Sequence, residues 1–247
     1  MALSQCKLCL KLAELIGAHI IPSCFYADNN LLFSDDCDYS KRRPTGTYDT
    51  RILCAECDNE IGKLDNYAKE VLFDLKGVVI EKFNDPSFQN KPLNLYRLND
   101  RHGYDKLNRF FVSVLWRASI SMHEDFASFN LRPYEAIARM AVLDESFDCS
   151  EIFSVVLCRL ADVKDPVNIF STKLKKIDSV NFYVFVLGIC KMFIKVDKQK
   201  LPVRFRSTVL STKSNVLMVE SNFLGMPERA QLVDKVKSVT RNRERKR

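Results

Sequence analysis

The sequence predicts an α+β fold, because three kinds of pattern follow one another along its 247 residues. Two Cys-x-x-Cys pairs lie within the first sixty residues. Apolar residues at helical spacing follow at about 105–145, and short runs of β-branched and aromatic residues indicate strands after residue 150. We therefore expect a cysteine-rich N-terminal module, then a helical segment, then a β-rich C-terminal part. A hydrophobic content of 47% is enough to bury a core.

The four N-terminal cysteines are expected to bind one structural zinc ion. Cys6 and Cys9 form the first pair, and Cys54 and Cys57 form the second. Two thiolates two residues apart can both reach one tetrahedral Zn²⁺ at about 2.3 Å, and a second pair completes a closed four-sulfur shell. The alternative is that these cysteines are buried or redox-active thiols.

Periodicity places three helices and several strands. Apolar positions at three- and four-residue steps predict helices over 59–73 and 107–120, and Pro133 is expected to open a further helix up to Leu143. Residues 84–106, with several prolines and asparagines, are expected to form a linker with turns. The expected strands are 153–158, 182–187, 192–196 and 216–219, with Gly188 in a turn.

These patterns suggest three regions. We expect a zinc-stapled module at residues 1–76, an α+β domain at 77–235, and a basic, disordered tail at 236–247. The alternative is that the tail makes loose contact with phosphate groups.

Net charge and cysteine content limit the expected partners and the expected cellular location. The net charge of +7 permits an acidic partner such as nucleic acid or a membrane surface. No secretory signal is visible, and the longest apolar stretch, 182–194, is interrupted by Gly188 and Lys191, so no membrane span is expected. Nine cysteines in a chain too large to need disulfides favour a reducing, cytoplasmic location.

The N-terminal motifs resemble a known family. Cys6 and Cys9 precede His19-Ile-Ile-Pro22, and Leu53 precedes Cys54-Ala-Glu-Cys57. This order resembles zinc-stapled HNH endonucleases, which use the ββα-metal form of the treble clef, over about residues 6–70. The chain is also similar to a narrower group of bacterial and phage proteins that share the block Phe110-Phe-Val-Ser-Val-Leu-Trp-Arg-Ala-Ser119. That likeness implies a phage or phage-defence setting.

The HNH resemblance implies a general base. His19 matches the histidine that deprotonates the water attacking phosphorus. Ala18 stands where the family often has a second metal ligand, and it cannot bind metal. Asp49 falls near the residue that orients the base. The alternative role for His19 is structural, against the cysteine cluster or in the core.

The same resemblance implies a divalent metal, Mg²⁺ or Mn²⁺, beside the base. Asp58 follows the second Cys-x-x-Cys pair at a ligand position of the family and is a suitable Mg²⁺ ligand. The last ligand position of the family falls at Gly62, which offers no donor. Glu60 could approach from the same helix start. The catalytic set expected from the resemblance is therefore His19, Asp49, Asp58 and Glu60.

Two further features bear on partners. Lys41, Arg42 and Arg43 lie between His19 and Cys54 and are expected to contact nucleic acid, or else to lie in a solvated loop. Trp116 is expected in the core, and Arg117, flanked by core residues, is expected to have an acidic or phosphate partner.

Two functions from different classes stay open. The first is an HNH-like, metal-dependent nuclease or nucleic-acid-binding protein. The second is a catalytically inactive, zinc-stapled scaffold that binds a protein partner. Carboxylates beside His19 would favour the first, and their absence would favour the second.

Overall fold

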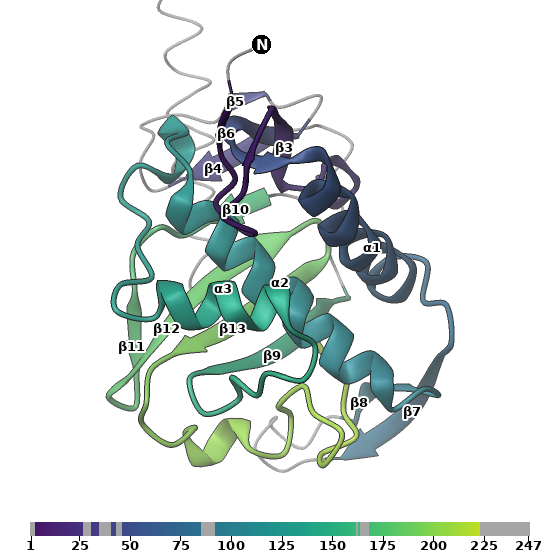
Figure 1. Cartoon of the computed structure of the whole chain (residues 1–247). Helices are drawn as coiled ribbons and strands as arrows, with labels where there is room; N and C mark the ends of the chain where they lie inside the picture. Colours follow the sequence, from purple (N-terminus) through teal and green to yellow (C-terminus); the bar gives the residue numbers. More distant parts are fainter. Residues whose placement is uncertain are drawn as a thin grey trace, which may run out of the picture.

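The computed structural model of the chain describes residues 3–26, 31–34, 41–42, 46–84, 92–161, 163 and 168–222. Within these ranges the protein has three α-helices, a ten-stranded sheet and two small two-stranded sheets. The expected α+β class is confirmed, and Figure 1 shows the helices packed against the large sheet. The basic tail, 236–247, lies outside the described residues.

Two small hairpins precede the first helix. Strands β1 (Ser4–Gln5) and β2 (Leu12–Ala13) pair with each other, as do β3 (Leu15–Ile21) and β6 (Thr47–Cys54). The second pair is called the β3–β6 hairpin, although residues 22–46 lie between its two strands. Helix α1 (Ala55–Leu72) begins directly after β6. Two acidic residues lie in its first turn, where the helix dipole favours negative charge. The helix then buries one apolar stripe. This stripe consists of Ile61, Leu64, Ala68, Val71 and Leu72.

The large sheet joins distant parts of the chain. Its order is β5-β4-β10-β12-β13-β9-β14-β8-β7, with β11 paired to β12. Most of its neighbours are antiparallel, but β4 pairs with β10 and β14 with β9 in parallel. Its strands are β4 (Leu31–Ser34), β5 (Lys41–Arg42), β7 (Val78–Asn84), β8 (Pro92–Leu98), β9 (Phe153–Leu160), β10 (Asn168–Phe170), β11 (Lys175–Ile177), β12 (Val180–Leu187), β13 (Cys190–Val196) and β14 (Met218–Ser221).

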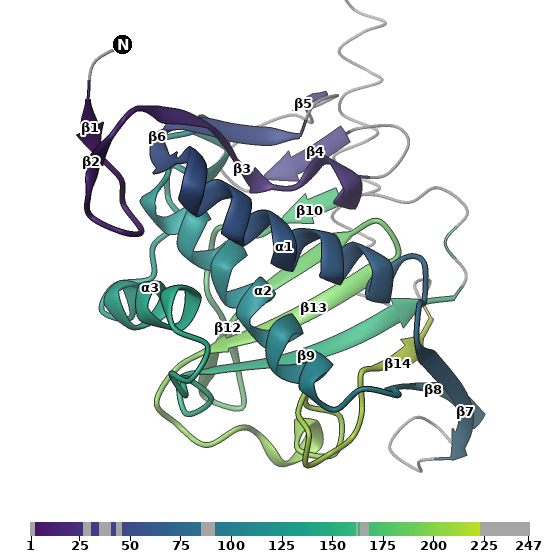
Figure 2. The ribbon, with the colours of Figure 1, turned by 45° about the vertical axis from the view of Figure 1, so that its right-hand side comes forward.

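The helices cover one face of this sheet. Helices α2 (His102–Ile120) and α3 (Glu135–Leu143) lie in front of β9, β12 and β13, and α1 runs beside α2 (Figure 2). Three short 3₁₀ helices complete the described elements: η1 (Ser23–Phe25), η3 (Glu124–Phe126) and η4 (Val203–Phe205). One hydrophobic core connects the helices, the β3–β6 hairpin and the sheet. No helix in the described ranges has the length and apolar character needed to cross a membrane.

The sequence placed most of the C-terminal strands correctly. The four expected strands correspond to β9, β12, β13 and β14, and Gly188 turns between β12 and β13 with φ of +58°. All three expected helices are present. The linker expected at 84–106 is wrong over Pro92–Leu98, which is a strand paired with both β7 and β14, and over residues 102–106, which form the start of α2. Burial of Leu95 and Tyr96 on this strand depends on β14, over a hundred residues away, so local composition did not reveal it.

Candidate metal centre and its surroundings

The four N-terminal cysteines meet at one place. Cys6 and Cys9 lie in the turn between β1 and β2, Cys54 ends β6, and Cys57 lies in the first turn of α1. Their sulfur atoms all lie within 4.8 Å of one another, and the Sγ atoms of Cys9 and Cys54 are 4.0 Å apart. Four thiolates bound to one zinc at 2.3 Å would be separated by about 3.8 Å. The group can therefore hold a metal ion, and its geometry is consistent with structural zinc.

The electrostatics of this group favour a cation. Burial acts to raise the pKa of the Cys6 thiol, but hydrogen bonds, foremost from the backbone N–H of Cys54, bring it to about 7. Burial raises the pKa of Cys54 and of Cys57, and the charge of Cys6 raises both further. One thiolate forms readily here, whereas additional thiolates need a positive ion to offset their repulsion.

Backbone contacts hold the first cysteine pair in place. The N–H of Lys7 donates to the carbonyl of Ile52 on β6 at 2.9 Å. Nε of Arg139, from α3, donates to the carbonyl of Leu8 at 2.8 Å and to that of Lys7 at 3.2 Å. Leu10 closes the turn with a left-handed φ of +65°. Sequence patterns do not reveal that Arg139 contacts this turn, because its partners are main-chain atoms 131 and 132 residues away.

His19 lies on β3, half-buried, beside the ring of Tyr48. The two ring centroids are 6.5 Å apart at an interplanar angle of 66°. Gly46, with φ of +80°, packs close to the imidazole: a Cβ atom built there would lie 3.2 Å from Cδ2 of His19. A larger residue at Gly46 would strain the backbone and displace His19, so this glycine positions the histidine.

A buried ion pair contacts the main chain of His19. Arg117 of α2 is fully buried, and its Nη1 and Nη2 donate to the two carboxylate oxygens of Asp65 at 2.9 and 2.8 Å. Nη1 also donates to the backbone carbonyl of His19 at 2.8 Å. The expected acidic partner of Arg117 is therefore Asp65. The neighbouring Trp116 is 1% exposed, which confirms its place in the core.

Asp49 is engaged on both carboxylate oxygens and faces away from His19. One oxygen accepts from the backbone N–H and from Nε of Arg51 at 2.9 and 3.2 Å, and the other accepts from Ser121 and Met122 at 3.0 and 2.9 Å. In the hairpin register Asp49 pairs with Ala18, whereas His19 pairs with Tyr48. Because adjacent residues of a strand point to opposite faces, Asp49 and His19 lie on different faces.

The pKa of Asp49 reflects these bonds. Burial acts to raise the pKa of this carboxyl, but the hydrogen bonds from Met122, Arg51 and Ser121 lower it below its ordinary value. The carboxylate thus ties β6 to the end of α2.

Asp58 lies near His19, at the start of α1. Burial raises the pKa of its carboxyl group, while Arg117 and His19 act in the opposite direction and Asp65 adds to the rise. The net effect is a raised pKa, so the charged carboxylate is destabilised and would gain from a bound cation. Asp58 lies in the first turn of α1, and His19 is one of the charged groups that act on its carboxyl.

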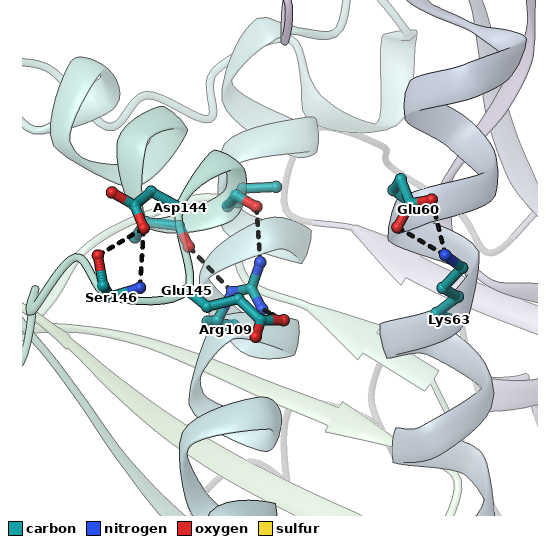
Figure 3. A network of polar contacts seen from close by, with 8 residues as sticks. Glu60, Lys63, Arg109, Asp144, Glu145 and Ser146 are labelled. Carbon is teal, nitrogen blue, oxygen red and sulfur yellow. Dashed lines mark hydrogen bonds and ion pairs between the residues drawn. The ribbon is translucent and has the colours of Figure 1, made fainter.

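Glu60 points elsewhere on α1. Residues two positions apart in an α-helix are separated by about 200° around the axis, so Glu60 lies on nearly the opposite side from Asp58. Both of its oxygens accept from Nζ of Lys63, at 2.7 and 2.8 Å (Figure 3). Across from it, Arg109 of α2 pairs with Glu145 at 2.6 Å. Glu60 borders a cavity of about 520 Å³ that is also lined by Cys9 and Cys57, but not by His19 or Asp58.

The basic residues expected at the site lie partly outside the described ranges. Lys41 and Arg42 form β5, at the edge of the large sheet, where they pair with Leu32 and Leu31. Arg43 is outside the described residues, and so is Cys37.

The other histidines and cysteines in the described ranges lie outside the cysteine group. His102 is exposed, whereas His123 is half-buried and its Nδ1 accepts from the backbone N–H of Asp125. Cys149 and Cys190 are buried core residues, and Cys158 is partly buried.

The structure thus brings together four cysteines, but it does not gather the expected acids. Within the described ranges, the cysteine group is the only set of three or more Cys, His, Asp or Glu side chains close enough to share a metal ion. Comparison with known proteins finds no family model that matches the chain, no matching curated protein and no matching solved structure.

Proposed function

We propose that this protein is an HNH-like, zinc-stapled protein that binds nucleic acid and hydrolyses phosphodiester bonds with Mg²⁺ or Mn²⁺. The observation that carries the proposal is the four-cysteine group that joins the β1–β2 turn to the start of α1, with His19 on β3 and Asp58 in the first turn of that helix. A hairpin followed by a helix, with a histidine on the hairpin and a ligand on the helix, is the arrangement expected of the treble-clef form of HNH enzymes. The four cysteines would hold zinc as a structural ion.

In this proposal His19 is the general base and Asp58 the metal ligand. His19 would accept a proton from the water that attacks phosphorus, and the leaving oxygen would depart from the opposite side. The divalent ion would stabilise the negative charge that develops on the phosphate oxygens. One carboxylate suffices for this purpose, because Mg²⁺ usually keeps several waters and binds proteins through one or two carboxylates plus substrate phosphates.

The proposal gives Asp49 and Glu60 no catalytic role. Asp49 would act through structure alone, since Arg51, Ser121 and Met122 already occupy its oxygens. Glu60 would lie outside the site, because it is paired with Lys63 on another side of α1. A phage or phage-defence setting and a cytoplasmic location belong to the same proposal, through the likeness in sequence to bacterial and phage proteins.

The test is cleavage of plasmid DNA and of RNA by the purified protein with Mg²⁺ or Mn²⁺. We expect His19→Ala and Asp58→Asn to lower the cleavage rate by about 100-fold or more, the usual contribution of a general base. Two matched controls on α2, His102→Ala and Asp105→Asn, change exposed residues of the same types and should keep the wild-type rate. Glu60→Gln should also cleave normally.

The second candidate is an inactive zinc-bound scaffold for a protein partner. It is favoured by the lack of a third metal-binding side chain beside His19 and Asp58 in the described ranges. Equal cleavage by wild type and His19→Ala, or no cleavage by a wild-type protein that contains its zinc, would leave this candidate in place of the nuclease.

A further inference from the structure

An aromatic side chain is exposed beside the candidate base. Tyr48 is 48% exposed and is the second residue of β6, whose first four residues alternate between buried and exposed. In the described part of the chain, the only other exposed aromatic side chain is Phe147, at 37%. Tyrosine buries large apolar area when a partner is present, so an exposed ring at a candidate site points to a ligand that covers it.

The surroundings of Tyr48 leave its ring available for stacking. Gly17, on the adjacent strand, lies beside the ring: a Cβ atom built there would be 3.5 Å from Cδ2 of Tyr48. This is an ordinary van der Waals distance, so the tyrosine ring packs over the main chain at Gly17. The edge contact with His19 fixes the ring next to the imidazole.

We propose that Tyr48 stacks on an unpaired nucleobase, so that this site takes single-stranded nucleic acid. The inference rests on the proposed function, and it adds the form of the substrate. A base inside a duplex has neighbours on both faces, whereas an unpaired base can place one face on the tyrosine ring. Because Tyr48 pairs with His19 across the hairpin, a base on its ring would bring an adjoining phosphate toward the imidazole.

In this proposal the duplex is the weaker ligand. Stacking on an aromatic side chain depends little on which base is present, so it selects strandedness rather than sequence. Positive charge elsewhere on the chain would attract either form of nucleic acid through its phosphates. Tyr48 therefore supplies the discrimination between the two forms.

The experiment measures binding directly and does not depend on cleavage. Fluorescence anisotropy of labelled single-stranded DNA, single-stranded RNA and the corresponding DNA duplex is followed in the Asp58→Asn background, which keeps His19 beside the ring and lacks the proposed metal ligand, so that no substrate is consumed. Tyr48→Leu keeps apolar bulk but removes the ring, Tyr48→Phe keeps the ring, and Phe147→Leu removes the other exposed ring. Circular dichroism and thermal unfolding verify that each variant is folded.

We expect Tyr48→Leu to weaken single-strand binding between about fivefold and a hundredfold, the range for loss of one base–aromatic stack. Tyr48→Phe and Phe147→Leu should bind like the parent, and duplex binding should change little in every variant. The salt dependence of binding should also stay unchanged, because phosphate contacts remain.

Two results would overturn the inference. Unchanged single-strand binding by a folded Tyr48→Leu variant removes the stacking role but leaves nucleic-acid binding intact. An equal loss for single strand and duplex shows that Tyr48 does not distinguish them. If the parent binds no nucleic acid in any form, the proposed function fails together with the inference, and this outcome differs from both of the others.

Discussion

The cysteine group and the surroundings of His19 form two regions of the same small module, and they differ in how their side chains are gathered. The four thiols come from two turns more than forty residues apart, yet their sulfur atoms lie within 4.8 Å of one another. The three acids expected around His19 come from a shorter stretch, but they go to different places. Asp49 binds the end of α2, Asp58 lies near His19, and Glu60 binds Lys63.

The difference teaches which motifs fix geometry by themselves. The local backbone of a Cys-x-x-Cys turn is enough to place two sulfur atoms side by side. Two such turns therefore form a four-sulfur group once the fold brings the turns into contact. A lone carboxylate has no such local constraint. Its direction is set by strand alternation, by position around a helix and by whichever donors are nearby. The predictions below test whether the cysteine group dominates stability while the acids adjust it.

The largest effect is expected from loss of the metal. Cys57→Ser should lower bound zinc from one ion per chain to none, and it should destabilise the start of α1 and the β1–β2 hairpin. Structural zinc in small modules contributes an apparent 10–16 kcal/mol of binding free energy, about as much as the whole stability of a typical domain. Elemental analysis and hydrogen exchange would measure both effects.

The control for this variant is Cys24→Ser, which changes a half-buried thiol outside the cysteine group. It should retain zinc and unfold like the wild type within about 1 kcal/mol. Full zinc occupancy in Cys57→Ser would show that the four sulfur atoms do not form the site.

The next effect is expected from the buried ion pair beneath His19. Arg117→Met or Asp65→Asn should each lower the free energy of unfolding by about 3–5 kcal/mol, because either change leaves the other group buried without its charge partner. The double variant Arg117→Met/Asp65→Leu should recover part of that loss. Urea unfolding measures all three variants.

Glu145→Gln offers a comparison, because it neutralises the partner of Arg109, another residue of α2, and leaves the hydrogen bonds of Arg109 to Ala141 and Val142 in place. Glu145 is 81% exposed, so its ion pair should contribute only about 1 kcal/mol. If Arg117→Met were as mild as Glu145→Gln, the Arg117–Asp65 pair would not be a main support of the hairpin.

The smallest effect is a contrast in pH dependence between two aspartates. Folding lowers the pKa of Asp49 below its ordinary value of 3.8, so its stabilising contribution is present above that pH and is lost as the pH falls through the folded pKa. Folding raises the pKa of Asp58, so the contribution of Asp58 is present below 3.8 and is lost as the pH rises through its folded pKa.

These opposite signs predict opposite responses to neutralisation. At neutral pH, Asp49→Asn should cost about 1–3 kcal/mol, because it weakens charge-assisted hydrogen bonds to a buried group. Asp58→Asn should leave stability unchanged or raise it by up to about 1 kcal/mol, although it should abolish cleavage. Urea unfolding followed from about pH 7 to about pH 3 separates the two. Destabilisation by Asp58→Asn at neutral pH would indicate a structural rather than a metal-binding role.

Sequence patterns were sufficient for the features that depend on local order. The three helices, the strands β9, β12, β13 and β14, and the convergence of the cysteines follow from periodicity and short motifs. The other strands of the large sheet were not predicted; these are β4, β5, β7, β8, β10 and β11. Strand β8 carries turn-forming residues, and β4 gains its place only through β10.

The candidate site divides in the same way. That Arg117 needs an acidic or phosphate partner could be predicted from a charged residue among apolar ones, but the identity of that partner could not. Asp65 lies 52 residues away, on another helix. The engagement of Asp49 by Ser121 and Met122, and the packing of Gly46 against His19, likewise depend on segments that meet only in the folded chain.

The parallel pairing of β4 with β10 has a consequence for synthesis. Leu32 lies opposite Asn168, which emerges from the ribosome 136 positions later. At translation rates of 5–20 residues per second, this delay is on the order of ten seconds. All four thiols of the cysteine group emerge early in that interval, while β4 still lacks its neighbouring strand. A nascent chain halted before β10 would therefore carry the complete cysteine group on an unfinished sheet.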